Sequence, residues 1–237
     1  MIPTPDLSHL TKDDFIRVYE PAGLYQHGNI NSELDIYMLS EDTFLLLDAL
    51  EDDADHLRTL KPTLIQLDLA QDAFRPFLDA FLEMNHAVSP VLITTDINPR
   101  AAHCTEATGR KNNVPLDAVI CNLVRPLKPR LSGQIDVLIF NPPYVPTEEE
   151  EAIMAQSQAD IAGAWAGGFD GMAVTNRLLD ELDSILSPKG CFYLVALKQN
   201  DPQGIIARMR EQCNLEGKAS FALKSLNGVK FTFSDRL

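Results

Sequence analysis

The sequence feature that most constrains the fold is a nearly continuous apolar run that ends in two prolines. Residues Ile135–Phe140 (IDVLIF) predict a strand, and Asn141-Pro142-Pro143-Tyr144 follows it directly. Each proline fixes φ and removes a backbone N–H, so this segment is stiff and cannot continue a sheet. The carbonyls of Asn141 and Pro142 and the Asn141 side-chain oxygen are left as acceptors, which suit a planar NH2 group, and Tyr144 can pack on the group that carries it. A rigid turn that merely ends the strand is the alternative explanation.

Strand and helix periods alternate along the rest of the chain, which indicates an α/β fold with a largely parallel sheet. Because the predicted strands are apolar over their whole length, helices should cover both faces of the sheet. Asn227-Gly228 predicts a hairpin turn between Ala219–Leu223 and Val229–Phe233, which adds an antiparallel edge. Strands are expected at Val91–Thr95, Leu116–Cys121, Ile135–Phe140 and Cys191–Leu197, and helices at Thr43–Leu57, Pro99–Gly109, Gly171–Leu186 and Pro202–Cys213.

The chain is acidic, which excludes several classes of partner. Its 237 residues include 20 Lys+Arg and 34 Asp+Glu, for a net charge of −14. Nucleic acids and anionic membranes need cationic patches, so neither is expected as a partner. No apolar run has the length of a membrane span, and the first residues lack the pattern of a secretory signal. The four cysteines form no CxxC pair and no His lies at ligand spacing, so we expect reduced thiols and no metal site.

Polar residues follow three of the predicted strands. Asp96 follows the first, Asn122 the second and Asn141 the third. In open α/β sheets, ligands bind outside the carboxyl ends of the strands, so these side chains should meet at one crevice. An acidic residue at such a strand end typically binds ribose hydroxyls, although it is also a common turn residue. The sequence therefore predicts a nucleoside pocket beside the proline-locked segment.

Several segments then match a known family. They are Val18–Ala22 (VYEPA), Glu41–Leu50 (EDTFLLLDAL), Thr95–Ala102 (TDINPRAA), Cys121–Leu123 (CNL), Phe140–Thr147 (FNPPYVPT), Ala164–Gly171 (AWAGGFDG) and Leu186–Pro202 (LSPKGCFYLVALKQNDP). On these segments the chain resembles the eukaryotic and archaeal release-factor glutamine methyltransferases, S-adenosylmethionine-dependent enzymes of the HemK-like group. The resemblance implies a Rossmann-like class I methyltransferase with a largely parallel seven-stranded sheet, which we expect to form a single domain over residues 1–237.

The resemblance also implies the partners and the role of each matched residue. The implied substrate is a class 1 translation release factor, methylated on a glutamine side-chain amide, and a small zinc-binding activator subunit is expected to form a heterodimer with the chain. The expected location is the cytoplasm, with the nucleus as a second one. On the cofactor side, the resemblance implies Thr43 near the methionine end, Asp96 on the ribose hydroxyls, and Asn122 and Leu123 beside the adenine. On the substrate side, it implies that Asn141 and Pro142 grip the amide, that Asn141 also touches the cofactor, and that Tyr144 packs on the amide. Trp165 and Gly167-Gly168 would lie at the substrate mouth, where Phe169 replaces a polar or basic residue.

The chain departs from the family pattern in two segments. Residues 23–40 form an extra segment that we expect to loop out. Within residues 66–90, the family's E-x-G-S-G-S-G loop is replaced by a stretch from Gln66 that has no glycine and adds Asp68 and Asp72. Glycines there let the backbone approach the cofactor, so we expect weak S-adenosylmethionine binding. Read one frame away with permitted synonymous codons, Leu67 to Leu78 spell I-G-S-G-S-G-C-V-S-S-F-L, which suggests a frame or splice error.

Two other functions remain open at this point. An N6-adenine nucleic-acid methyltransferase shares the NPPY segment, because an exocyclic adenine NH2 resembles an amide NH2. The net charge of −14 and the absence of a separate basic domain argue against it. A catalytically impaired product of a faulty gene model is the second alternative, favoured by the lost glycines and opposed by the intact TDIN, NPPY and AWAGG segments.

Overall fold

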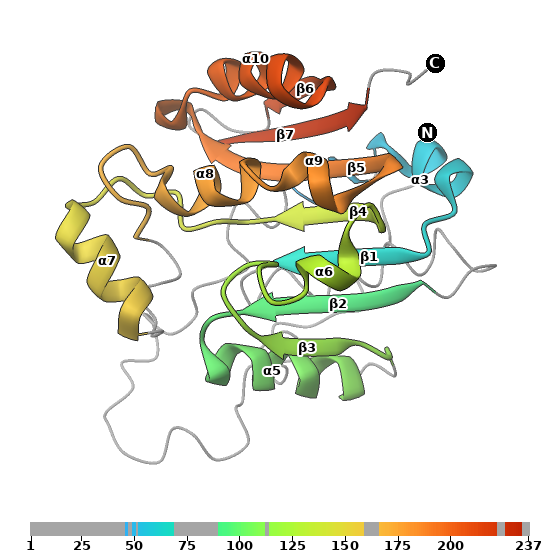
Figure 1. Ribbon diagram of the computed structural model, residues 1–237, viewed down its shortest axis with the longest axis horizontal. Helices are drawn as coiled ribbons and strands as arrows, with labels where there is room; N and C mark the ends of the chain where they lie inside the picture. Colours follow the sequence, from blue (N-terminus) through green and yellow to red (C-terminus); the bar gives the residue numbers. More distant parts are fainter. Residues whose placement is uncertain are drawn as a thin grey trace, which may run out of the picture.

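A single mixed sheet organises the molecule (Figure 1). The computed structural model describes residue 46 and residues 49–50, 52–68, 90–111, 114–158, 166–221 and 226–233. The sheet has seven strands in the order β3-β2-β1-β4-β5-β7-β6. The strands are β1 (Leu64–Asp68), β2 (Val91–Asp96), β3 (Asp117–Ile120), β4 (Ile135–Phe140), β5 (Leu186–Leu197), β6 (Leu215–Phe221) and β7 (Leu226–Phe233).

Strand direction confirms the predicted fold class. Parallel pairing joins the five strands β3, β2, β1, β4 and β5. The C-terminal hairpin supplies the other two, because β7 pairs antiparallel with both β5 and β6. The sheet is therefore largely parallel with an antiparallel edge. The central strand β1 takes in Gln66 and Asp68, so the atypical segment 66–90 begins inside the sheet; residues 69–89 and the extra segment 23–40 lie outside the described residues.

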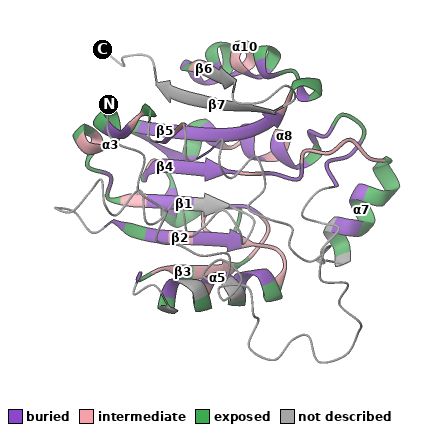
Figure 2. Cartoon of the chain, turned by 180° about the vertical axis from the view of Figure 1, so that it is seen from behind, coloured by how far each residue is buried: buried purple, intermediate pink, exposed green. Residues whose placement is uncertain are grey.

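The core lies on both faces of β4 and β5. Phe140 and Phe192 face the side covered by α6, α8, α9 and α10. Ile139 and Tyr193 face the other side, where they join Leu57 of α3. β4 is buried along its length and β5 along most of it, apart from the exposed Pro188 and Lys189, whereas β3 is only partly covered at the edge (Figure 2). The helices are α3 (Ala54–Leu60), α5 (Pro99–Lys111), α6 (Lys128–Leu131), α7 (Glu149–Gln158), α8 (Ala173–Leu179), α9 (Leu182–Ile185), the 3-10 turn η3 (Lys198–Asn200) and α10 (Pro202–Cys213).

The helix predicted over Gly171–Leu186 is wrong as one element. It divides into α8 and α9, and β5 begins at Leu186, upstream of the predicted start at Cys191. Leu186 pairs with Ile135 of β4, and the Ser187 hydroxyl donates to Asp136 at 2.7 Å. These non-local contacts hold the Ser-Pro-Lys-Gly stretch in an extended conformation, although its local sequence favours a turn.

The hairpin prediction is correct, but its turn is misplaced. Asn227 pairs with Phe221 on one side and with Ala196 on the other, and Gly228 pairs with Ser220 and Val195. Both residues therefore lie within β7, and the connection falls in residues 222–225, outside the described residues. A strand with partners on both sides gains backbone hydrogen bonds that outweigh the turn preference of an Asn-Gly pair.

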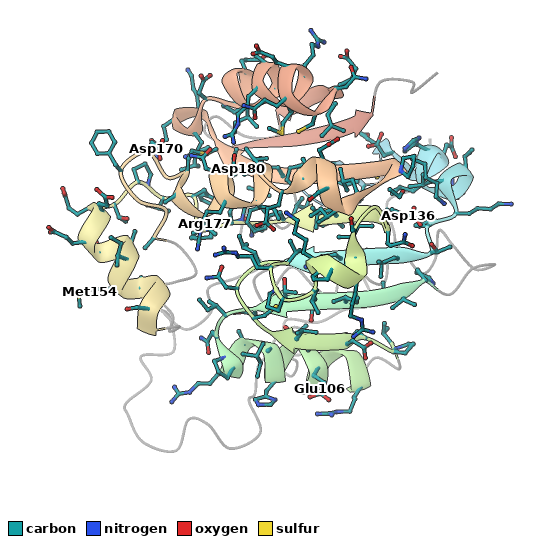
Figure 3. All side chains as sticks on the ribbon, in the orientation of Figure 1. Glu106, Asp136, Met154, Asp170, Arg177 and Asp180 are labelled. Carbon is teal, nitrogen blue, oxygen red and sulfur yellow. The ribbon has the colours of Figure 1, made fainter. Side chains whose placement is uncertain are left out.

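Asp136 ties together the amino ends of three strands. This buried carboxylate accepts hydrogen bonds from the Thr63 backbone N–H at 2.7 Å, the Thr63 hydroxyl at 2.8 Å and the Ser187 hydroxyl. The Lys189 ammonium lies 3.6 Å away. Burial acts to raise the pKa of Asp136, but these hydrogen bonds and the Lys189 charge outweigh it and hold the pKa below its ordinary value. Figure 3 shows Asp136 at the end of the sheet opposite α7, far from Asp170.

Candidate functional site

Asp96 and Asn141 lie at the same level on either side of β1. Leu67 of β1 is aligned with Thr94 of β2 and with Ile139 of β4. Two positions further along, the chain reaches Asp96 on β2 and Asn141 directly after β4. Strands lie about 4.8 Å apart, which puts about 10 Å between β2 and β4. Both residues therefore stand at the carboxyl edge of the sheet with the end of β1 between them, as the sequence predicted.

The local fold fixes the Asp96 carboxylate at the end of β2. One of its oxygens accepts the Asn98 backbone N–H at 2.7 Å, and the Asn98 side chain in turn accepts the Arg100 N–H at 2.9 Å, where α5 begins. Burial raises the pKa of Asp96 above its ordinary value, and the Asn98 hydrogen bond only partly opposes this. A carboxylate can accept several hydrogen bonds, so Asp96 suits a pair of neighbouring hydroxyls.

Asn122 and Leu123 form a tight turn after β3. The Cys121 backbone N–H donates to the Asp96 carbonyl at 2.9 Å, which places this turn beside Asp96. Leu123 is buried and has a φ of 52°, a left-handed conformation that costs a non-glycine residue about 1–2 kcal/mol. The Cys121 thiol donates to the Leu123 carbonyl at 3.1 Å. Strained backbone of this kind is concentrated at functional sites.

A basic side chain approaches the same turn from α8. Arg177 Nη1 lies 3.5 Å from Asn122 Oδ1, a long hydrogen bond. Burial and the nearby Arg125 charge lower the pKa of Arg177. Figure 3 shows Arg177 on the α7 side of the sheet centre. Sequence analysis did not identify this residue, because an arginine within an amphipathic helix gives no signal of its own.

The proline-locked segment leaves β4 and is supported from behind. Pro142 and Pro143 are buried, whereas Asn141 and Tyr144 are half-buried. Val145 forms a parallel bridge with Ala166, and the Gly167 N–H donates to the Val145 carbonyl at 2.8 Å. The segment is therefore held against a second loop, which we call the glycine turn (residues 166–171).

Hydrogen bonds and close packing hold the glycine turn. The Thr147 N–H donates to the Gly168 carbonyl at 2.8 Å, and the Gly168 N–H donates to the Thr147 hydroxyl at 3.1 Å. Gly168 and Gly171 have φ values of 82° and 72°, which glycine adopts without strain. Phe169, between them, is 89% exposed. Figures 1 and 2 place α7 and this turn beyond the carboxyl ends of the strands.

Most of the predicted site falls within the described residues. The structure brings Asp96, Asn122, Leu123 and Asn141 to one edge, with Pro142 and Tyr144 next to them. Thr43 and Trp165 lie outside the described residues, so their roles stay predictions. Asn200, which was not predicted from the sequence, ends η3 just beyond β5; its place near a strand end is a weak signal, and its hydrogen-bond partners are not visible in the sequence.

Among the residues that the structure describes, no group of three His, Cys, Asp or Glu side chains could hold a metal ion. In that part of the chain, no helix combines the length and the apolar character needed to cross a bilayer.

The chain is similar to several characterised methyltransferases. It is 38% identical to methyltransferase HEMK2 of Homo sapiens over 98% of this chain and 97% of that protein. It is 42% identical to methyltransferase HEMK2 of Mus musculus over 80% of this chain and 85% of that one. It is 36% identical to the eRF1 methyltransferase catalytic subunit mtq2 of Schizosaccharomyces pombe over 84% and 81%. No protein-family model matches the chain.

Solved structures agree on the fold. The Thermus thermophilus 16S rRNA N2 G1207 methyltransferase RsmC, in complex with AdoMet and guanosine, aligns with a TM-score of 0.55 at 13% identity over 85% of this chain and 45% of that chain. The human Mettl16 catalytic domain aligns with a TM-score of 0.56 at 14% identity over 82% and 70%. At such low identity these structures show a Rossmann-like class I methyltransferase fold and no more. The sequence relatives go further, and on their evidence the chain belongs to the S-adenosylmethionine-dependent release factor glutamine methyltransferase family.

Proposed function

We propose that the chain transfers a methyl group to the glutamine side-chain amide of a class 1 translation release factor. The observation that carries this proposal is the equal level of Asp96 and Asn141 on the two strands that flank β1. In this proposal Asp96 accepts the nucleoside hydroxyls and Asn141 accepts a planar NH2 group, and the two residues stand at the same edge of the sheet. A transfer between two bound molecules needs this arrangement, because both must be held together in the correct orientation.

The residues described at this edge fit S-adenosylmethionine. Asp96 would hold the ribose hydroxyls, and Asn122 and Leu123 would lie beside the adenine. When bound, this cofactor supplies an electrophilic methyl group on a sulfonium. The fit is poorer at the end of β1, because Asp68 ends that strand, level with Phe140, where the family has glycine. An acidic residue in place of that glycine adds negative charge to the sequence at this strand end and removes the freedom of glycine, so we expect weak cofactor binding.

The proline-locked segment would hold the acceptor. An amide nitrogen is a weak nucleophile because its lone pair is delocalised. The Asn141 side-chain oxygen and the Pro142 carbonyl each accept one N–H of the substrate amide, which favours a more pyramidal nitrogen and aims it at the methyl group. Tyr144 packs on the amide plane. The nitrogen is positively charged after transfer and then loses its proton, so no strong base is needed beforehand.

We further propose that the small zinc-binding activator docks at the β3 edge of the sheet. An edge strand offers backbone N–H and C=O groups to which a partner can add. Ile120 of β3 and Val91 of β2 are 49% and 53% exposed, unusually high for large apolar residues in strands. A pocket of about 400 Å³ lies between α5 and β3. These features favour a partner that covers apolar surface.

The cellular location follows from the proposed substrate. Release factors act on translating ribosomes, so we propose a cytoplasmic enzyme with a second pool in the nucleus. Microscopy of the tagged chain tests this directly, and a signal confined to a membrane-bound organelle would contradict it.

A labelled methyl donor tests the activity. The chain, with its activator and donor at millimolar concentration, is incubated with a class 1 release factor or with duplex DNA. We expect label in the release factor and none in the DNA. Label in the DNA alone would instead support an adenine methyltransferase. Label in neither, even at saturating donor, would contradict the proposed activity for this chain.

A further inference from the structure

We propose that Asn200 is a positioning residue for amide methylation, because it clamps the proline-locked segment to the glycine turn. The inference rests on the proposed function, in which that segment grips the substrate amide. Asn200 ends η3, just beyond β5, and is only 4% exposed. It touches neither Asn141 nor Asp96 in any contact that the structure records, so its effect on the reaction would be indirect.

Three hydrogen bonds use the Asn200 carboxamide. Its Nδ2 donates to the Tyr144 carbonyl at 3.1 Å and to the Asp170 carbonyl at 2.9 Å. Its Oδ1 accepts the Leu197 backbone N–H at 2.6 Å. Because only an NH2 group can serve two carbonyls and only an oxygen can serve an N–H, the orientation of the carboxamide is unambiguous. Asn200 therefore joins three separate segments: the loop after β4, the glycine turn and the end of β5.

Close packing shows that these segments meet without a gap. A Cβ added to Gly171 would lie 2.1 Å from the Tyr144 carbonyl oxygen and 2.5 Å from Asn200 Nδ2. A Cβ on Gly167 would lie 2.5 Å from the Pro143 carbonyl oxygen. Only glycine at positions 167 and 171 allows this close approach, so the buried Asn200 spans a narrow seam in which an unpaired carbonyl would be costly.

The seam fixes the exit of the proline-locked segment. Its entry is already fixed, because Phe140 pairs with Leu194 of β5. Pro142 and Pro143 make the segment stiff. A stiff segment that is held at one end alone could still pivot as a rigid unit. Asn200 holds the other end at Tyr144, directly before the Val145–Ala166 bridge and the Gly167–Val145 hydrogen bond that hold the next residue. The acceptor oxygens of Asn141 and Pro142 lie between these two anchors, and a shift of 1 Å there can cost about 100-fold in rate.

Substitution of Asn200 by Asp tests this role. Asn200→Asp keeps the shape of the side chain but replaces both donors with acceptors that face the Tyr144 and Asp170 carbonyls. We expect kcat for release factor methylation to fall about 10- to 100-fold, with less than about a twofold change in KM for the methyl donor. Asn214→Asp, an exposed asparagine after α10, is the matched control and should leave both constants unchanged. An unchanged kcat in Asn200→Asp, or equal losses in kcat and donor binding, would overturn the proposal.

A second pair of variants guards against loss of folding in Asn200→Asp. Gly171→Ala pushes a methyl group into the seam, whereas Gly133→Ala, with a similar φ of 66°, meets nothing within 4 Å. Both carry the same backbone strain, so any difference between them reports on the seam. We expect Gly171→Ala to reproduce the kcat defect and Gly133→Ala to remain active. Equal kcat in the two variants would overturn the proposal.

Hydrogen exchange separates this inference from the proposed function. If the wild-type chain transfers no methyl group, the proposed function fails, but the seam can still be measured. In Asn200→Asp the N–H groups of Thr147, Gly167 and Gly171, which donate across or within the seam, should exchange faster, while those of β4 should not. Unchanged exchange at these three amides would overturn the clamp, whatever the activity.

Discussion

Asp96 combines two requirements that oppose each other. The site needs an ionised carboxylate at the end of β2, but burial raises the pKa of Asp96 and so makes its charge unfavourable in the folded chain without ligand. Because the pKa of Asp96 is higher in the folded chain than in the unfolded chain, ionisation of Asp96 lowers the free energy of unfolding as pH rises from the unfolded-state pKa to the folded-state pKa. Conflicts of this kind between stability and binding are typical of functional residues.

Substitution of Asp96 by Asn should therefore stabilise the chain and weaken nucleoside binding. Asparagine keeps the acceptor for the Asn98 N–H but carries no buried charge. At pH 7 we expect the thermal midpoint to rise by roughly 2 °C. The gain should shrink as pH falls toward 3.8, the ordinary pKa of the carboxyl group, and vanish below it, where this group is protonated in both the folded and the unfolded chain. Affinity for S-adenosylhomocysteine, measured by calorimetry, should fall about tenfold. A destabilised variant with unchanged affinity would contradict this assignment.

Asp136 shows the opposite sign, as expected of a structural carboxylate. Its hydrogen bonds hold its pKa below the ordinary 3.8, so the stability that it contributes is present above that value and is lost as pH falls through the lowered pKa. Asp136→Asn replaces one carboxylate oxygen with an NH2 group, which faces either the two Thr63 donors or the Ser187 hydroxyl and should cost about 1–3 kcal/mol at pH 7. Chemical denaturation measures this, and the difference should shrink below pH 4.

The control for Asp136 is an aspartate that is exposed to solvent. Asp55 pairs with Arg58 at 2.7 Å, but its side chain is 96% exposed. Asp55→Asn should change the free energy of unfolding by less than about 1 kcal/mol. If the two variants lost equal stability, the Asp136 network would not be what ties the strand ends together.

At the scale of elements, the sequence predicted the bounds of those strands and helices that local interactions determine. Ile135–Phe140 and Pro202–Cys213 have the predicted bounds, because the first is apolar throughout and the second begins with Pro202, directly after the capping Asp201. The misplaced hairpin turn and the early start of β5 share one cause. In both places a strand finds partners that are distant in sequence, and no local pattern reports them.

The glycine turn is the element with the clearest functional prediction. It presents Phe169, 89% exposed, beside the amide site, where the resembled family has a polar or basic residue. Phe169→Arg should leave the free energy of unfolding within about 0.5 kcal/mol, because the side chain packs on little. We expect KM for the release factor to change at least threefold, with donor affinity unchanged. Equal KM values would show that Phe169 does not touch the substrate.

At the scale of the whole molecule, the site is predictable only in part. Asp96, Asn122 and Asn141 could be placed together because parallel strands expose their carboxyl ends at one edge. Asn200 and Arg177 could not, because their roles depend on how loops and α8 pack across the sheet. The order of the strands also needed the structure, since it places β1 between the two strands that carry Asp96 and Asn141.

The lack of glycine from the end of β1 onward affects the whole cofactor site. Replacing Asp68, Ala70 and Asp72 by glycine should raise the affinity for S-adenosylhomocysteine at least about tenfold, through closer backbone approach and lost negative charge. Asp68→Asn with Asp72→Asn removes the charge alone and should recover only part of the gain. Calorimetry compares the three proteins, and micromolar affinity in the unaltered chain would contradict the expected weak binding.

The central claim is that the proline-locked segment holds the acceptor amide while the nucleoside binds at the carboxyl end of β2, on the other side of β1. Its most direct test is tandem mass spectrometry of a release factor treated with the wild-type chain or with Asn141→Ala, at saturating methyl donor. We predict a methyl group on a glutamine side-chain nitrogen with the wild type, and at least about a 100-fold loss with Asn141→Ala at unchanged S-adenosylhomocysteine affinity. Methylation of the same glutamine at an equal rate by both proteins would contradict the account.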